Sequence, residues 1–231
     1  MRTCRHLIAT VILLIAPVTA SPVSAQDGPT DESERPAGAA RGGGAAVGAT
    51  RGAEARRARP TLLELAYADA LSILSRDNSC SRFLGGSGAA EEALGRLVAQ
   101  LRGGMISDAT VGIRMSGAFT FYSRPAKGFS YRLFAEARIN TFGPFYKATA
   151  FRTDPFKFIP NVGSFRPNTR EARVLMLLHE LGHLIVGPGG RWLLPDDADN
   201  PSQNARNTAL VESQCREQIL SLRDGAGGRA G

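Results

Sequence analysis

The stretch Leu178-His179-Glu180-Leu181-Gly182-His183 is the most informative part of this chain, because it holds two of only three histidines. The apolar run from Val174 to Leu178 that leads into it predicts a buried helix. On a helix, the i, i+4 spacing places both imidazoles on one face, where their ring nitrogens can hold a single Zn²⁺ ion. Glu180 then lies beside the open coordination position, placed to accept a proton from zinc-bound water.

The helix that carries this motif has clear expected ends. Asn168 or Thr169 can cap its beginning, and Gly187-Pro188 is expected to end it. The stretch 154–167 before it, with its prolines and glycine, is expected to be an ordered loop. A last helix is expected over about residues 204–222.

Two further helices and a small sheet are expected upstream. Thr61 can cap a first helix in a capping box with Glu64, with an end near residues 75–78, and a second helix is expected over residues 89–101. Alternating aromatic and β-branched residues between Ala109 and Phe151 predict three or four strands in an antiparallel or mixed sheet.

Composition divides the chain into four segments. Residues 1–25 have the basic start, apolar run and small-residue end of a secretory signal peptide, so we expect a secreted or periplasmic protein. Residues 26–60 are rich in Gly, Ala and Arg and are expected to form a disordered tether or pro-segment. One domain is expected over residues 61–222, followed by a flexible tail, 223–231, with no membrane span in the mature form.

The cysteine content indicates the redox environment of the protein, and the charge pattern indicates which partners to expect. Loss of Cys4 with the signal peptide leaves Cys80 and Cys215, which are expected to form a disulfide in an oxidising compartment; two unpaired buried thiols are the alternative. The formal net charge is +7, but the basic residues are scattered and do not alternate with aromatics. Nucleic acid is therefore not an expected partner, and the sequence does not indicate an oligomeric state.

The segment His179-Glu180-Leu181-Gly182-His183 resembles the zincin superfamily of metallopeptidases, whose helix carries His-Glu-x-x-His. The resemblance covers one helix, and a chance match between two core histidines and a glutamate is the structural alternative. It implies a zincin-like α+β fold in which a small antiparallel or mixed sheet packs on the metal-binding helix and a C-terminal helix. It also implies His179 and His183 as zinc ligands, Glu180 as the general base, and a peptide or protein substrate that pairs with an edge strand.

The third zinc ligand is left open by the motif. Metzincins place a third histidine at a fixed short spacing after the second, and no histidine follows His183 here, so that subclass is not expected. A gluzincin-like arrangement would use Glu212 on the last helix. An aspzincin-like arrangement would use one of the acidic residues that follow the metal-binding helix closely, and we favour this loop slightly and assign Asp197. The candidates in that loop are Asp196, Asp197 and Asp199.

An exported zinc metallopeptidase is therefore the expected function, although the sequence does not identify the donor that would stabilise the oxyanion of peptide hydrolysis. The candidate donors are Arg191, Arg206, Tyr131 and Tyr146. Two alternatives stay open. One is a non-catalytic, zinc-stabilised binding or scaffold protein, and the other is a deformylase-like amidase, in which a reduced Cys80 or Cys215 would join the two histidines.

Overall fold

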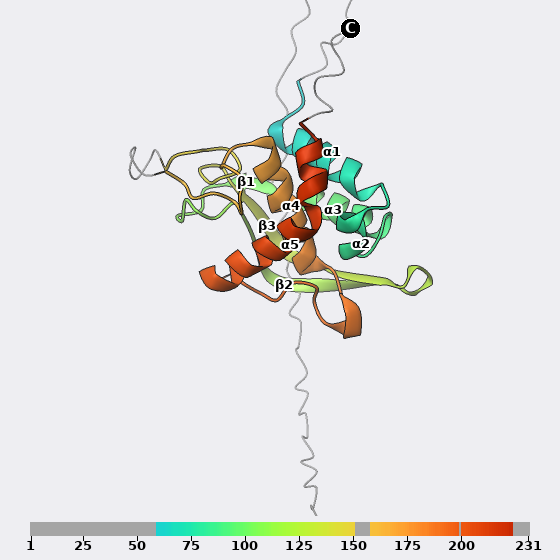
Figure 1. Ribbon diagram of the computed structural model, residues 1–231. Helices are drawn as coiled ribbons and strands as arrows, with labels where there is room; N and C mark the ends of the chain where they lie inside the picture. Colours follow the sequence, from blue (N-terminus) through green and yellow to red (C-terminus); the bar gives the residue numbers. More distant parts are fainter. Residues whose placement is uncertain (1–58, 151–157, 199, 224–231) are drawn as a thin grey trace, which may run out of the picture. The chain divides into compact units, whose positions relative to one another are not determined.

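Five α-helices and a three-stranded mixed sheet make up the residues that the computed structural model describes, 59–150, 158–198 and 200–223 (Figure 1). The expected signal peptide, nearly all of the expected tether and most of the expected tail lie outside these residues. The described residues all belong to one compact unit, Arg56–Gly231. Among them, no helix is long and apolar enough to cross a membrane.

The elements follow one another in an α+β order. Short 3-10 turns lie at Pro125–Lys127 and Pro188–Gly190. The helices and strands are α1 (Leu62–Leu74), α2 (Ser79–Phe83), α3 (Ala89–Gln100), β1 (Arg102–Gly104), β2 (Ile113–Arg124), β3 (Phe129–Asn140), α4 (Arg170–Leu184) and α5 (Pro201–Ser221).

Local hydrogen bonds explain where the helices begin. The Thr61 hydroxyl accepts from the Glu64 amide at 3.2 Å and the Glu64 carboxylate accepts from the Thr61 amide at 2.6 Å, which confirms the predicted capping box. Thr169, rather than Asn168, caps α4 by accepting from the amide of Ala172. Asn200 caps α5, so this helix begins earlier than expected, with Pro201 in its first turn.

The sheet has the strand order β1-β3-β2, so the long hairpin β2–β3 places β2 at one edge. The pairing of β2 with β3 is antiparallel and shifts register between Ser116 and Phe119, where Gly117 has a φ of +82°. This bulge adds one residue to β2. The parallel strand β1 was missed, because Gly103-Gly104 was interpreted only as a helix stop.

α4 runs through the hydrophobic core and packs against α1, α3 and α5. Its apolar side chains are almost fully enclosed, as predicted, and among them are Val174, Leu175, Leu177, Leu178, Leu181 and Leu184. The helix ends at Leu184, three residues before the predicted stop. The reason is tertiary: Ile185 and Val186 become extended, with Ile185 opposite Tyr131 of β3 and the Val186 amide donating to the carbonyl of Ser130.

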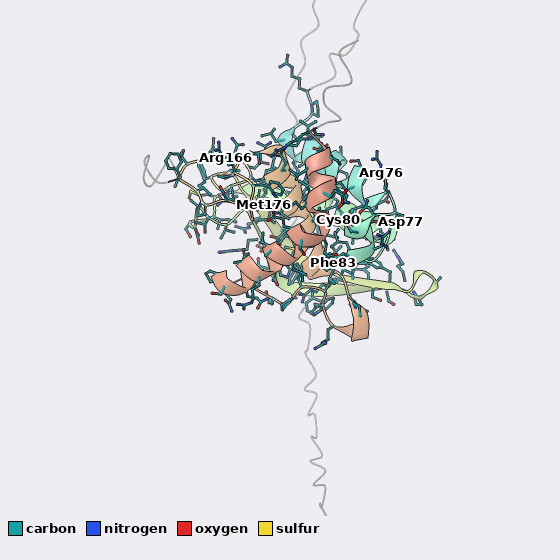
Figure 2. All side chains as sticks on the ribbon, in the orientation of Figure 1. Arg76, Asp77, Cys80, Phe83, Arg166 and Met176 are labelled. Carbon is teal, nitrogen blue, oxygen red and sulfur yellow. A yellow bond between two sulfur atoms is a disulfide. The ribbon has the colours of Figure 1, made fainter. Side chains whose placement is uncertain are left out.

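A disulfide between Cys80 and Cys215 joins α2 to α5 and confirms the predicted pairing. Figure 2 labels Cys80 where α2 meets α5. The Ser79 hydroxyl also donates to the carbonyl of Gln214 at 2.6 Å, so two adjacent residues of α2 hold one turn of α5. Disulfides are typical of proteins from oxidising compartments.

Candidate metal centre

Three side chains that are good metal ligands meet at the C-terminal half of α4. Nε2 of His179 lies 3.1 Å from Nε2 of His183, and the carboxylate of Asp197 lies 3.3 Å from the first and 3.2 Å from the second. Their side chains are only 6–9% exposed. Among the described residues, this is the only group of three or more His, Cys, Asp or Glu side chains close enough to share a metal ion.

Asp197 reaches the histidines because the chain after α4 folds back onto that helix. Gly182 has no side chain, and a Cβ atom there would lie 2.6 Å from Cδ1 of Leu194. Leu194 fills this space, is fully buried, and donates its amide hydrogen to the carbonyl of Gly182 at 3.2 Å. The glycine between the two histidines therefore lets the following loop approach closely and bring Asp197 to them.

Two adjacent residues of α5, Asn207 and Thr208, form hydrogen bonds with two of these ligands. The Thr208 hydroxyl oxygen lies 3.0 Å from Nδ1 of His179. The Asn207 side-chain amide donates to Asp197 Oδ2 at 2.6 Å and to the carbonyl of Pro195 at 2.9 Å, while its oxygen accepts from Gln203 at 2.8 Å. Sequence reasoning missed Asn207 and Thr208. Their signal was two buried polar residues on the inner face of α5, which only packing reveals.

The electrostatics favour an ionised Asp197. Burial raises the pKa of this carboxyl, but hydrogen bonds from His179 and His183 outweigh burial and hold its pKa well below the usual range. Burial lowers the pKa of His183, but the bond to Asp197 and the charge of Glu180 outweigh it and leave the pKa raised. The three groups thus form a site whose anionic ligand attracts cations, whether protons or a metal ion.

Glu180 lies beside this group in a cleft of about 1060 Å³. Burial raises its pKa above the usual value, Asp197 adds to the rise, and the two histidines oppose it. A carboxylate with a raised pKa is a stronger base, which suits proton transfer near neutral pH. The cleft lies between the edge-strand side of the sheet, α4, α5 and the loop 160–164, and Figure 2 labels one of the α4 side chains that line it, Met176.

The other described acidic candidates for the third ligand are not part of the ligand group. Asp196 is exposed and lines the cleft without joining the ligand group. Glu212 accepts hydrogen bonds from the amide of Ser164, at 2.9 Å, from its hydroxyl, and from Arg216. Glu212 therefore holds the loop at Ser164, and although it lines the same cleft it is not one of the three grouped ligands. Asp199 lies outside the described residues.

None of the four predicted oxyanion donors lines the cleft. The Tyr131 hydroxyl donates to Glu92 of α3, and Tyr146 packs on Phe145. Arg191 and Arg206 are exposed, the latter bonded to Gln203. These residues were proposed on chemistry alone, and their distance in space could not be read from the sequence.

Arg132 of β3 is a cleft residue that sequence reasoning missed. It is only 6% exposed, its Nε donates to the carbonyl of His183 at 3.0 Å, and its guanidinium lies 4.0 Å from the centre of the Trp192 ring. Burial lowers its pKa, and Asp196 opposes that effect. The sequence did not single out Arg132, because β3 also carries Glu136 and Arg138, and only packing shows that Arg132 is the buried one of the three. Arg132 and Arg114 are the cationic side chains that line the cleft in the described part of the chain.

No protein-family model, no curated protein and no solved structure has significant similarity to this chain.

Proposed function

We propose that this protein is an exported zinc-dependent hydrolase of the zincin type, most simply a metallopeptidase that uses Glu180 as its general base. The observation that carries the proposal is the group formed by His179, His183 and Asp197 with Glu180 next to it in an open cleft. The disulfide and the predicted signal peptide support export.

The donor set fits zinc in both chemistry and spacing. Two imidazole nitrogens and one carboxylate oxygen are ordinary zinc ligands, at roughly 2.0–2.2 Å from the metal. Two such ligands of a tetrahedral ion are about 3.3 Å apart. Here the two Nε2 atoms are 3.1 Å apart, and each lies close to one oxygen of Asp197, His183 at 3.2 Å from Oδ1 and His179 at 3.3 Å from Oδ2. Three protein ligands leave a fourth position open, which is typical of catalytic rather than structural zinc sites.

The chain's own residues supply the remaining parts of a hydrolytic mechanism. When bound, zinc supplies Lewis acidity that polarises a carbonyl and acidifies water. Glu180 accepts a proton from the attacking water and returns it to the leaving amine. Arg132 is the best-placed candidate for stabilising negative charge that develops on the carbonyl oxygen, because its buried guanidinium lines the cleft beside α4.

An extended peptide is the substrate that suits this cleft. Within the described residues, β2 pairs only with β3, and residues 112–117 at the start of β2 line the cleft. An exposed strand edge offers backbone donors and acceptors in the spacing of another strand. A peptide added along this edge would present one of its carbonyls to the ligand group, which supports a peptide or protein substrate.

The alternatives differ in what they need from the site. A deformylase-like enzyme needs a cysteine thiolate as third ligand, and Cys80 and Cys215 are joined to each other. A zinc-stabilised scaffold needs neither an open cleft nor an acid beside the ligands. The position of Glu180 in the cleft therefore favours an enzyme.

The Glu180→Gln variant tests the enzyme directly. We expect it to bind one zinc ion per chain, as the wild type does, and to lose about 10²–10⁴-fold in turnover, since general-base catalysis is worth that much. Turnover is measured with a library of fluorescence-quenched peptides, and zinc by elemental mass spectrometry. Glu217→Gln, an exposed change on α5, is the matched control and should keep full activity.

Equal turnover by Glu180→Gln and the wild type would overturn the role of Glu180. A wild-type protein that binds zinc but cleaves no peptide in the library would favour the scaffold alternative. Absence of stoichiometric zinc in the wild type, even after zinc is added back, would remove the metal site and the enzyme with it.

A further inference from the structure

We propose that Asn207 and Thr208 of α5 are positioning residues that set the orientation and charge distribution of two metal ligands, so that α5 determines the affinity of the site for zinc. This inference rests on the proposed function, because it concerns the same ligand group. It goes further in assigning roles to two residues that bind neither metal nor substrate.

Thr208 holds the ring orientation of His179 and is placed to bond the tautomer that metal binding requires. A histidine that binds metal through Nε2 must carry its proton on Nδ1. Nδ1 of His179 lies 3.0 Å from the Thr208 hydroxyl oxygen, which can accept a hydrogen bond from Nδ1–H and so leaves Nε2 for a metal ion shared with His183 and Asp197. Thr208 is 8% exposed, so water does not readily replace the bond.

Asn207 controls which carboxylate oxygen of Asp197 is available to bind a metal ion. Its amide nitrogen donates one hydrogen to Asp197 Oδ2 and the other to the carbonyl of Pro195, and its own oxygen is occupied by Gln203. Both amide hydrogens and the amide oxygen of Asn207 therefore have partners. A flip of the amide group would lose all three hydrogen bonds. Oδ2 lies 3.3 Å from His179 Nε2 but is already bonded to Asn207, whereas Oδ1, 3.2 Å from His183 Nε2, receives no bond from Asn207 and is therefore the oxygen that we assign to the metal.

The two residues act together because they are consecutive on one helix. Adjacent side chains of an α-helix point about 100° apart, so a single turn of α5 can reach both the ligand on α4 and the ligand on the loop. Both residues are buried polar groups, and buried polar groups need partners. Partners behind metal ligands typically change metal affinity by about 10–100-fold.

The test compares zinc affinity in the full chain, measured by competition with a chromophoric chelator. We expect Thr208→Val, which keeps the size and removes the hydroxyl, to weaken zinc binding about 10–100-fold, and Thr208→Ser to restore it. Asn207→Leu should weaken binding by a similar factor. Ser213→Ala removes an exposed hydroxyl from the same helix and should leave affinity unchanged, so it is the matched control.

A spectroscopic measurement separates positioning from general destabilisation. Co²⁺ in place of zinc gives absorption bands that report the ligand geometry, and we expect them to shift in Thr208→Val and to return in Thr208→Ser. Circular dichroism identifies variants that do not fold. If the variant at one of the two positions does not fold, the variant at the other position still tests the inference.

Affinities within about twofold of the wild type in both Thr208→Val and Asn207→Leu, with unshifted Co²⁺ bands, would overturn the inference while leaving the metal site intact. A wild-type chain that binds no zinc would instead overturn the proposed function on which it rests.

Discussion

At Gly182, helix propensity favours alanine, whereas packing against Leu194 favours glycine. Alanine is favoured over glycine inside a helix by about 1 kcal/mol. A Cβ atom at this position would, however, lie 2.6 and 2.8 Å from two carbon atoms of the buried Leu194 side chain. Overpacking of a filled core costs roughly 1–3 kcal/mol, so we expect Gly182→Ala to lower the free energy of unfolding, measured by chemical denaturation.

Leu194→Ala provides the control for this prediction. In that background the space above Gly182 is empty, and Gly182→Ala should become neutral or stabilising because only helix propensity remains. Stabilisation of the wild-type background by Gly182→Ala would show that Leu194 does not restrict this position. We also expect Gly182→Ala in the wild-type background to bind zinc more weakly, since it would displace Leu194, which belongs to the loop that carries Asp197.

At the scale of elements, α2 and α5 are joined by a covalent link. The disulfide Cys80–Cys215 joins residues 135 positions apart. On the chain-entropy model, a loop of this length contributes on the order of 4–5 kcal/mol. We expect the Cys80→Ser/Cys215→Ser variant to unfold at a clearly lower denaturant concentration than the wild type.

The same experiment with a reductant serves as its control. Reduction should lower the unfolding midpoint of the wild type and leave the double serine variant unchanged. Coincident unfolding curves for the oxidised wild type and the double variant would contradict the prediction. Because α5 also carries Asn207 and Thr208, we expect the double variant to bind zinc more weakly as well.

At the scale of the whole molecule, a bound metal would tie together elements that are distant in sequence. Its ligands come from α4 and from the loop before α5, and α5 holds them in place. A ligand that binds only the folded state stabilises it by about 4 kcal/mol at 1,000 times its dissociation constant. For a domain of this size we expect zinc to raise the melting temperature by roughly 10 °C.

Calorimetry of the chelated and zinc-saturated protein measures this effect. The His183→Ala variant should show the same melting temperature with and without zinc. An equal response of the variant and the wild type would place the zinc-dependent stabilisation somewhere other than this site.

Much of the fold could be predicted because its signals are local. The capping box of Thr61 and Glu64 depends on residues three apart, and the alternation in β2 and β3 depends on residues two apart. The two histidines share a helix face for the same reason. The even number of cysteines expected after signal removal led to the correct disulfide.

The sequence by itself therefore determined the helix of the candidate centre, two of its ligands and its neighbouring acid, since these lie within five residues. Only the tertiary structure separated Asp197 from Asp196 and Glu212, because the direction of a loop side chain depends on how Leu194 packs against Gly182. It also decided the contacts of Thr208 with His179 and of Arg132 with His183, which join residues 29 and 51 positions apart. Hydrogen bonds over such separations depend on how helices and strands pack, and no short stretch of sequence encodes that packing.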